Sequence, residues 1–79
     1  MSPTVFRYRG YRFFFFSREE RRVHVHVHAA SGEAKFWVEP EVELAQSWGL
    51  AKGELNGLLA LAKERRDEIT ECWKKHFGS

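Results

Sequence analysis

A hexapeptide at residues 23–28, Val-His-Val-His-Val-His, alternates apolar and imidazole side chains without interruption. Successive side chains of a strand point to opposite faces, so the pattern predicts a strand with valines on one face and histidines on the other. The valines can join a core, and neighbouring histidines then lie about 7 Å apart along the strand. Because histidine titrates near neutral pH and ligates metals, this row is a candidate functional site.

The segment 33–38 alternates in the same way, and the residues 29–32 between the two segments are typical of a turn. We therefore expect an antiparallel hairpin of 23–28 with 33–38. The apolar residues Ala34, Phe36 and Val38 would face the core with the valines. The histidine face would gather three further side chains: Glu33, Lys35 and Trp37.

Strand-forming residues also fill 5–8 and 11–16, joined by a plausible tight turn at Arg9-Gly10. The charged segment 17–22 should be a loop. Residues 42–46 are compatible with either a further strand or one helical turn, and 47–49 should break the chain. From 52 to 77, apolar residues recur at spacings of three, four or seven, which predicts a helix.

These elements predict an α+β fold, a small antiparallel sheet of three to four strands packed on one long C-terminal helix. The helix would cover the valine face and leave the histidine face uncovered. The aromatic side chains of Trp48, Trp73 and Phe77 are expected to be packing residues, as is Cys72.

A chain of 79 residues forms one domain, residues 1–79, and buries only about 60% of its unfolded surface. We expect it to form a homodimer or a hetero-oligomer, which would cover the exposed sheet face. A single cysteine excludes an internal disulfide and suits the cytoplasm. The N-terminus lacks a signal-peptide pattern, and the longest apolar run, Phe13 to Phe16, is too short to span a membrane.

Positive charge is concentrated in the first thirty residues, which hold six arginines and two glutamates. The guanidinium group suits phosphate and carboxylate recognition. Two interpretations stay open: a solubilising fringe, or a surface that faces an anion or a nucleic acid. In the second, Arg18, Arg21 and Arg22 would form the rim of the histidine face.

The histidine face admits several chemistries. His24 and His26 could both reach one metal ion, with Glu33 as a further ligand, but the sequence holds no complete ligand set and we expect no metal. Alternatively, the two histidines could act as acid and base on RNA while Lys35 and the arginines hold the phosphate. Trp37 could stack on a base, anchor a protein partner or cap the sheet edge.

No nucleotide-binding glycine loop, cysteine zinc pattern or Gly-x-Ser-x-Gly elbow occurs, so we expect no cofactor. Whether the chain is an enzyme stays open. If it is one, a metal-independent ribonuclease is the class that the histidines, lysine and arginines would fit.

An ordered set of short motifs resembles a small bacterial family catalogued as domain of unknown function 4160. These are 3–5 Pro-Thr-Val, 11–17 Tyr-Arg-Phe-Phe-Phe-Phe-Ser, 24–27 His-Val-His-Val, 32–38 Gly-Glu-Ala-Lys-Phe-Trp-Val, 42–45 Val-Glu-Leu-Ala and the helix ending in Trp73. The family commonly has prolines before its His-x-His pair, where this chain has Arg22-Val23. His28 extends the shared pair.

Members of that family are encoded beside a second small protein, in a layout typical of toxin–antitoxin modules. The resemblance therefore implies a type II toxin that is neutralised by a cognate antitoxin protein. RNA is the target that the histidine face would suit. The alternative is a non-enzymatic binding module, either antitoxin-like or a nucleic-acid-binding partner protein.

Overall fold

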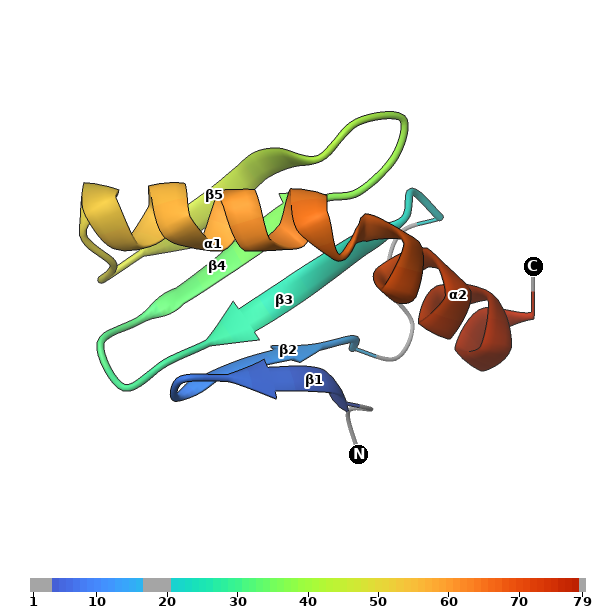
Figure 1. Cartoon of the computed structure of the whole chain (residues 1–79), viewed down its shortest axis with the longest axis horizontal. Coiled ribbons are helices and arrows are strands. Elements are labelled where there is room, and N and C mark those ends of the chain that lie inside the picture. Colours follow the sequence, from blue (N-terminus) through green and yellow to red (C-terminus); the bar gives the residue numbers. More distant parts are fainter. Residues whose placement is uncertain (1–3, 17–20, 79) are drawn as a thin grey trace.

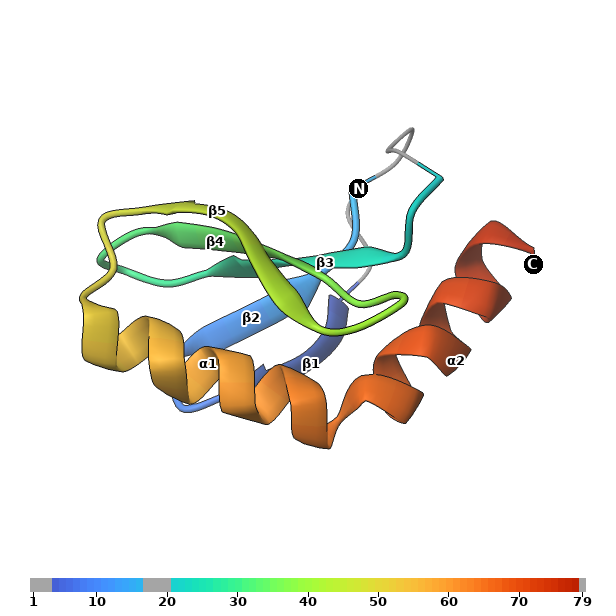
Figure 2. The ribbon, with the colours of Figure 1, turned by 90° about the horizontal axis from the view of Figure 1, so that it is seen from above.

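The computed structural model describes residues 4–16 and 21–78, and these form one antiparallel sheet covered on one face by two helices (Figures 1 and 2). The strands are β1 (Thr4–Tyr8), β2 (Tyr11–Phe14), β3 (His24–His28), β4 (Glu33–Trp37) and β5 (Glu43–Trp48). The helices are α1 (Lys52–Glu64) and α2 (Arg66–Phe77). The α+β class is confirmed, but the expected three to four strands and single helix must be corrected to five strands and two helices.

The strands follow one another across the sheet in chain order, β1-β2-β3-β4-β5, as a meander (Figure 1). The predicted hairpin of β3 and β4 is confirmed, with His26 opposite Lys35 and His28 opposite Glu33. The turn between β1 and β2 is also as predicted, since Arg9 and Gly10 both have positive φ, 48° and 84°. Two successive positive φ angles match the twist of a tight hairpin.

The core lies between the sheet and the helices. Alternation brings Phe13, Val25, Val27 and Phe36 onto the helix-covered face, where each is fully buried. The helices contribute a small set of apolar residues to the same cluster: Leu58, Ala62, Ile69 and Trp73. The residues that alternate along the strands and those that recur with helical spacing over 52–77 therefore pack against each other in one core.

The segment after Pro40 is a strand rather than a helical turn. Glu43–Trp48 pairs with β4 along the sheet edge, with a bulge between the pairs Lys35↔Gln46 and Phe36↔Leu44. The break expected at 47–49 falls after Trp48, where the strand ends, since Gly49 has a positive φ of 79°. A Cβ on Gly32 would clash with the Trp48 carbonyl and lie 2.8 Å from Gly49 Cα, so the two loops can approach only because both residues lack side chains.

The long helix predicted over 52–77 is interrupted at Arg65, whose φ and ψ are −104° and 21°. The interruption lies between the buried residues Ala62 and Ile69, where helical spacing would place an apolar residue and the chain has Arg65 and Arg66. Arg66 donates from Nε to the Val38 carbonyl (3.1 Å) and from Nη2 to the Pro40 carbonyl (3.2 Å), while Arg65 lies over the Phe6 ring. These contacts fasten the junction to the sheet, and Figure 2 shows α2 turning away from the line of α1 toward the far end of β3.

Candidate functional site

The sheet face opposite the helices, here called the outer face, carries most of the sequence-predicted site residues. Register and alternation assign these side chains to it: Arg12, Phe14, His24, His26, His28, Glu33, Lys35, Trp37, Gln46 and Trp48. Neither helix of the described chain lies across this face (Figure 2), and α2 meets it only at its His24 end, through Trp73. Cationic, aromatic and imidazole groups therefore share one surface.

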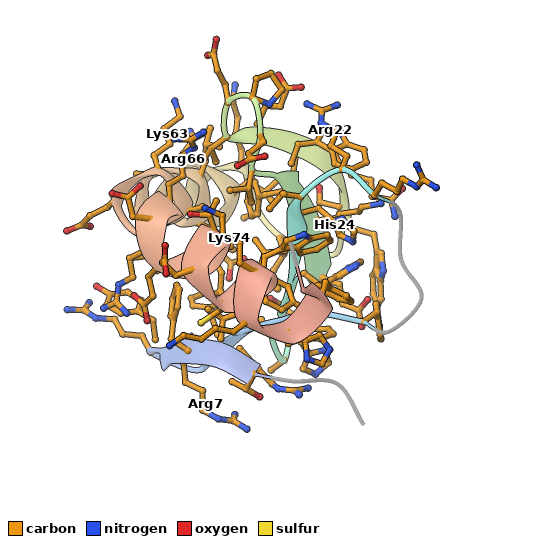
Figure 3. The ribbon with its side chains drawn as sticks, turned by 90° about the vertical axis from the view of Figure 1, so that its right-hand side faces the viewer. Arg7, Arg22, His24, Lys63, Arg66 and Lys74 are labelled. Atoms are coloured by element: carbon orange, nitrogen blue, oxygen red, sulfur yellow. The ribbon has the colours of Figure 1, made fainter. Side chains whose placement is uncertain are left out.

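His24 is the exception, because its side chain is fully buried. Its Nδ1 donates to the Arg22 carbonyl at 2.7 Å, and its ring packs edge-on against Trp73 of α2 (5.1 Å) and Trp37 (5.8 Å) between ring centroids. Figure 3, which looks from the α2 end, shows His24 beneath Arg22 on the sheet side of the molecule. The predicted uncovered histidine row therefore starts with a histidine that has no surface for a substrate.

His26 lies beside His24, with ring centroids 5.2 Å apart, and is half-buried. It contacts the rings of Phe14 (5.6 Å) and Phe16 (4.5 Å). Arg12 covers Phe14 from outside, with its guanidinium carbon 4.6 Å from the ring centre. His26 is thus part of an aromatic cluster, of which Phe16 is the most exposed member at 41%.

Trp37 lies between two cations. The Arg22 guanidinium carbon is 4.4 Å from its ring centre and the Lys35 ammonium is 4.5 Å from it. Arg22 is held in place by a bond from Nε to the Glu39 carbonyl (2.8 Å) and an ion pair with Glu43 (3.0 Å). The sequence correctly predicts that Arg22, Lys35 and Trp37 come together, although no signal in it pointed to Glu43.

A second tryptophan, Trp48, ends β5 beside the start of β4. Trp48 lies opposite Glu33, and its exposed fraction of 66% corrects the expectation that it packs in the core. His26, Lys35, Gln46 and Trp48 are among the residues that line a polar hollow of about 50 Å³ beside it. Strict alternation would put Trp48 on the same face as Leu44, and only the bulge in β5 separates the two, so no local pattern in the sequence revealed this residue.

Glu33 belongs with His28 rather than with the other two histidines. Their side chains approach to 3.3 Å between Nδ1 and Oε2, and both are about half exposed. Across residues 4–16 and 21–78, no three His, Cys, Asp or Glu side chains gather in a way that could hold a metal ion. The metal site considered for His24, His26 and Glu33 is therefore not assembled here.

The arginine rim is divided. Arg18 lies outside the described residues, whereas Arg21 and Arg22 line an open hollow of about 520 Å³ together with Arg66. Lys63 lies near Arg66 on the helix side (Figure 3). Cations therefore extend from the outer face around the end of β3 to the helix junction.

The groups with shifted pKa lie on the opposite side of the sheet. Glu54 accepts bonds from the Ala51 backbone N–H (3.0 Å) and the Tyr11 hydroxyl (2.7 Å), which lower its pKa. The same bond from Tyr11, together with burial and the Glu54 charge, raises the pKa of the phenol. Glu54 is at the start of α1, so this contact ties the helix to β2 and has no connection with the outer face.

Comparison with known proteins gives a family but no relative of known activity. The model of a family described as "Domain of unknown function (DUF4160)" matches residues 10–74. No curated protein matches the chain, and no solved structure does. Among the described residues, neither helix is long and apolar enough to cross a membrane.

Proposed function

The chain belongs to the DUF4160 family, and on that premise we propose that it is a cytoplasmic toxin that binds single-stranded RNA on its outer face. A cognate antitoxin protein would neutralise it by direct contact. The observation that carries the proposal is Trp37, an aromatic ring held between the Arg22 guanidinium and the Lys35 ammonium. Rings among cations are the usual means by which a sheet binds bases and phosphates of a single strand.

Binding fits the geometry better than cleavage by a histidine pair. A general acid or base must come within hydrogen-bond reach of the proton that it moves. His24 is fully buried and its Nδ1 is bonded to a backbone carbonyl, so it supports the structure of the site from within. Arg22, Lys35 and Trp37 of this face reach solvent at least in part. The two cations can bind phosphate, and the Arg22 guanidinium, backed by the Trp37 ring, can stack on a base.

Inducible expression in a bacterial host tests the proposal. The test variant is Lys35→Ala/Trp37→Ala, which removes a cation and a ring from the outer face. The matched control is Lys52→Ala/Leu44→Ala, which removes an exposed cation of α1 and an exposed apolar side chain of β5. All proteins are compared at equal soluble expression.

Growth arrest by the wild type and the control, but not by the test variant, is the expected result. Arrest should be relieved when the proposed antitoxin protein is co-expressed. RNA incubated with the purified protein should be retained without change in length. Equal arrest by all three proteins would move the activity away from the outer face, and arrest by none would contradict the toxin role.

A further inference from the structure

The hollow beside Trp48 has features that are not needed for binding single-stranded RNA regardless of its sequence. Trp48 is the most exposed large apolar side chain among the described residues, at 66%, and it stands at the edge of the sheet. Its indole forms one wall of a hollow whose other lining residues include Glu33, Lys35 and Gln46. An exposed ring beside a polar notch can hold a base by its face and by its edge at the same time.

We propose that this hollow, here called the Trp48 pocket, is a base-specific subsite that selects guanine in single-stranded RNA. The inference rests on the proposed RNA-binding function and names the base that it recognises. A volume of about 50 Å³ admits the edge of a base but not its ring system. The ring would therefore lie on Trp48, with its hydrogen-bonding edge directed into the notch.

The lining groups decide which base fits. A carboxylate only accepts hydrogen bonds, an ammonium only donates them, and an amide does both. Guanine offers N–H donors at N1 and N2 next to acceptors at O6 and N7. Glu33 would accept from the donors, since its contact with His28 involves only Oε2. Gln46 would donate to O6 through its amide N–H, since the Lys35 ammonium lies over the Trp37 ring. Uracil and cytosine present shorter edges, and adenine lacks an acceptor at the position of O6.

Strand spacing places this pocket at a useful distance from Trp37. Trp37 and Glu33 are four residues apart on β4, or about 13 Å at ordinary strand rise. Trp48 lies directly opposite Glu33. Single-stranded RNA that runs along β4 could therefore contact Arg22 and Trp37 first and the Trp48 pocket second, with Lys35 between them.

The test measures fluorescence anisotropy with four labelled RNA octamers, U8 and U8 with guanine, adenine or cytosine in place of the fourth base. The wild type should bind the guanine octamer about tenfold more tightly than U8, a difference in the range of one base contact. Trp48→Ala should abolish that preference. Glu33→Ala should abolish it, measured as the ratio of guanine-octamer affinity to U8 affinity, and Trp48→Phe should preserve it. Leu44→Ala, on the same strand but the other face, is the control.

Each result decides the matter. Guanine preference that is lost in Trp48→Ala and Glu33→Ala, but kept in the control, supports the pocket. Equal binding of all four octamers by the wild type overturns the guanine site and leaves RNA binding on the outer face standing. Guanine preference that survives Trp48→Ala overturns the placement. If no octamer binds, both the pocket and the proposed function are wrong. Thermal unfolding of each variant shows whether any loss reflects misfolding.

Discussion

At the scale of single residues, His24 shows how a surface pattern can conceal a structural role. The alternation of residues 23–28 assigns it to the same face as His26 and His28, and the register agrees. The direction of α2 brings Trp73 against the His24 ring, and His24 Nδ1 donates a hydrogen bond to the Arg22 carbonyl. Burial of an imidazole with its polar atom satisfied is a packing arrangement, and it orients the neighbouring His26 and Trp37.

His24→Ala should therefore lower the free energy of unfolding by about 2–4 kcal/mol, because it opens a cavity and leaves a carbonyl without its donor. His28→Ala on the same strand is the matched control, since that side chain is more than half exposed. It should change stability by less than about 0.5 kcal/mol. Urea unfolding monitored by tryptophan fluorescence measures both, and equal effects would contradict the structural role of His24.

Glu54 should make stability depend on pH at the acidic end. Its pKa is lowered in the folded chain, so its contribution is present above its ordinary value of 4.5 and is lost as pH falls through the folded value. The raised pKa of Tyr11 acts at the alkaline end, where stability falls as pH rises past 10.0. Melting temperatures of wild type and Glu54→Gln, measured from pH 7 down to pH 3, should converge. A constant difference across that range would contradict this linkage.

At the scale of elements, the parts with a strong period could be predicted and the junctions could not. The β3–β4 hairpin, its register of faces and the Arg9-Gly10 turn all follow from local pattern. The interruption at Arg65 does not, because the bonds from Arg66 to the Val38 and Pro40 carbonyls join residues 26 to 28 positions apart. The fifth strand was ambiguous for the same reason, since its pairing with β4 is a tertiary contact.

Glycines of the loops and of α1 should respond oppositely to alanine. Gly57→Ala should raise the free energy of unfolding by about 0.5–1 kcal/mol, because Gly57 is helical and an added Cβ meets nothing within 4 Å. Gly32→Ala should lower it by more, because the new Cβ would meet Gly49 and the Trp48 carbonyl. Chemical unfolding of the two variants checks both signs. A neutral Gly32→Ala would show that the two loops are not in close contact.

At the scale of the whole molecule, a small core is combined with exposed apolar side chains at one sheet edge. β5 pairs only with β4 among the described strands, and it carries Leu44 and Trp48 at 42% and 66% exposure. An unpaired edge strand with apolar side chains is a site of association. A second chain that pairs with β5 would extend the sheet in its own plane, so it would leave the outer face open.

We therefore expect the chain alone to self-associate through β5. Light scattering after size exclusion should give a dimer mass at high protein concentration. Ala45→Lys, which places a charge on the edge strand, should shift the protein to a monomer without unfolding it. A wild-type protein that stays monomeric throughout the concentration range would contradict this expectation.

The most direct test of RNA binding on the outer face uses the three tryptophan indole N–H signals in a nitrogen–proton correlation spectrum. Trp37 and Trp48 lie on the outer face, and Trp73, only 5% exposed, is the internal control. On titration with U8 RNA, we predict that the signals of Trp37 and Trp48 shift while that of Trp73 does not. Shifts confined to α1 and the β1–β2 hairpin, or no shifts at all, would contradict the account.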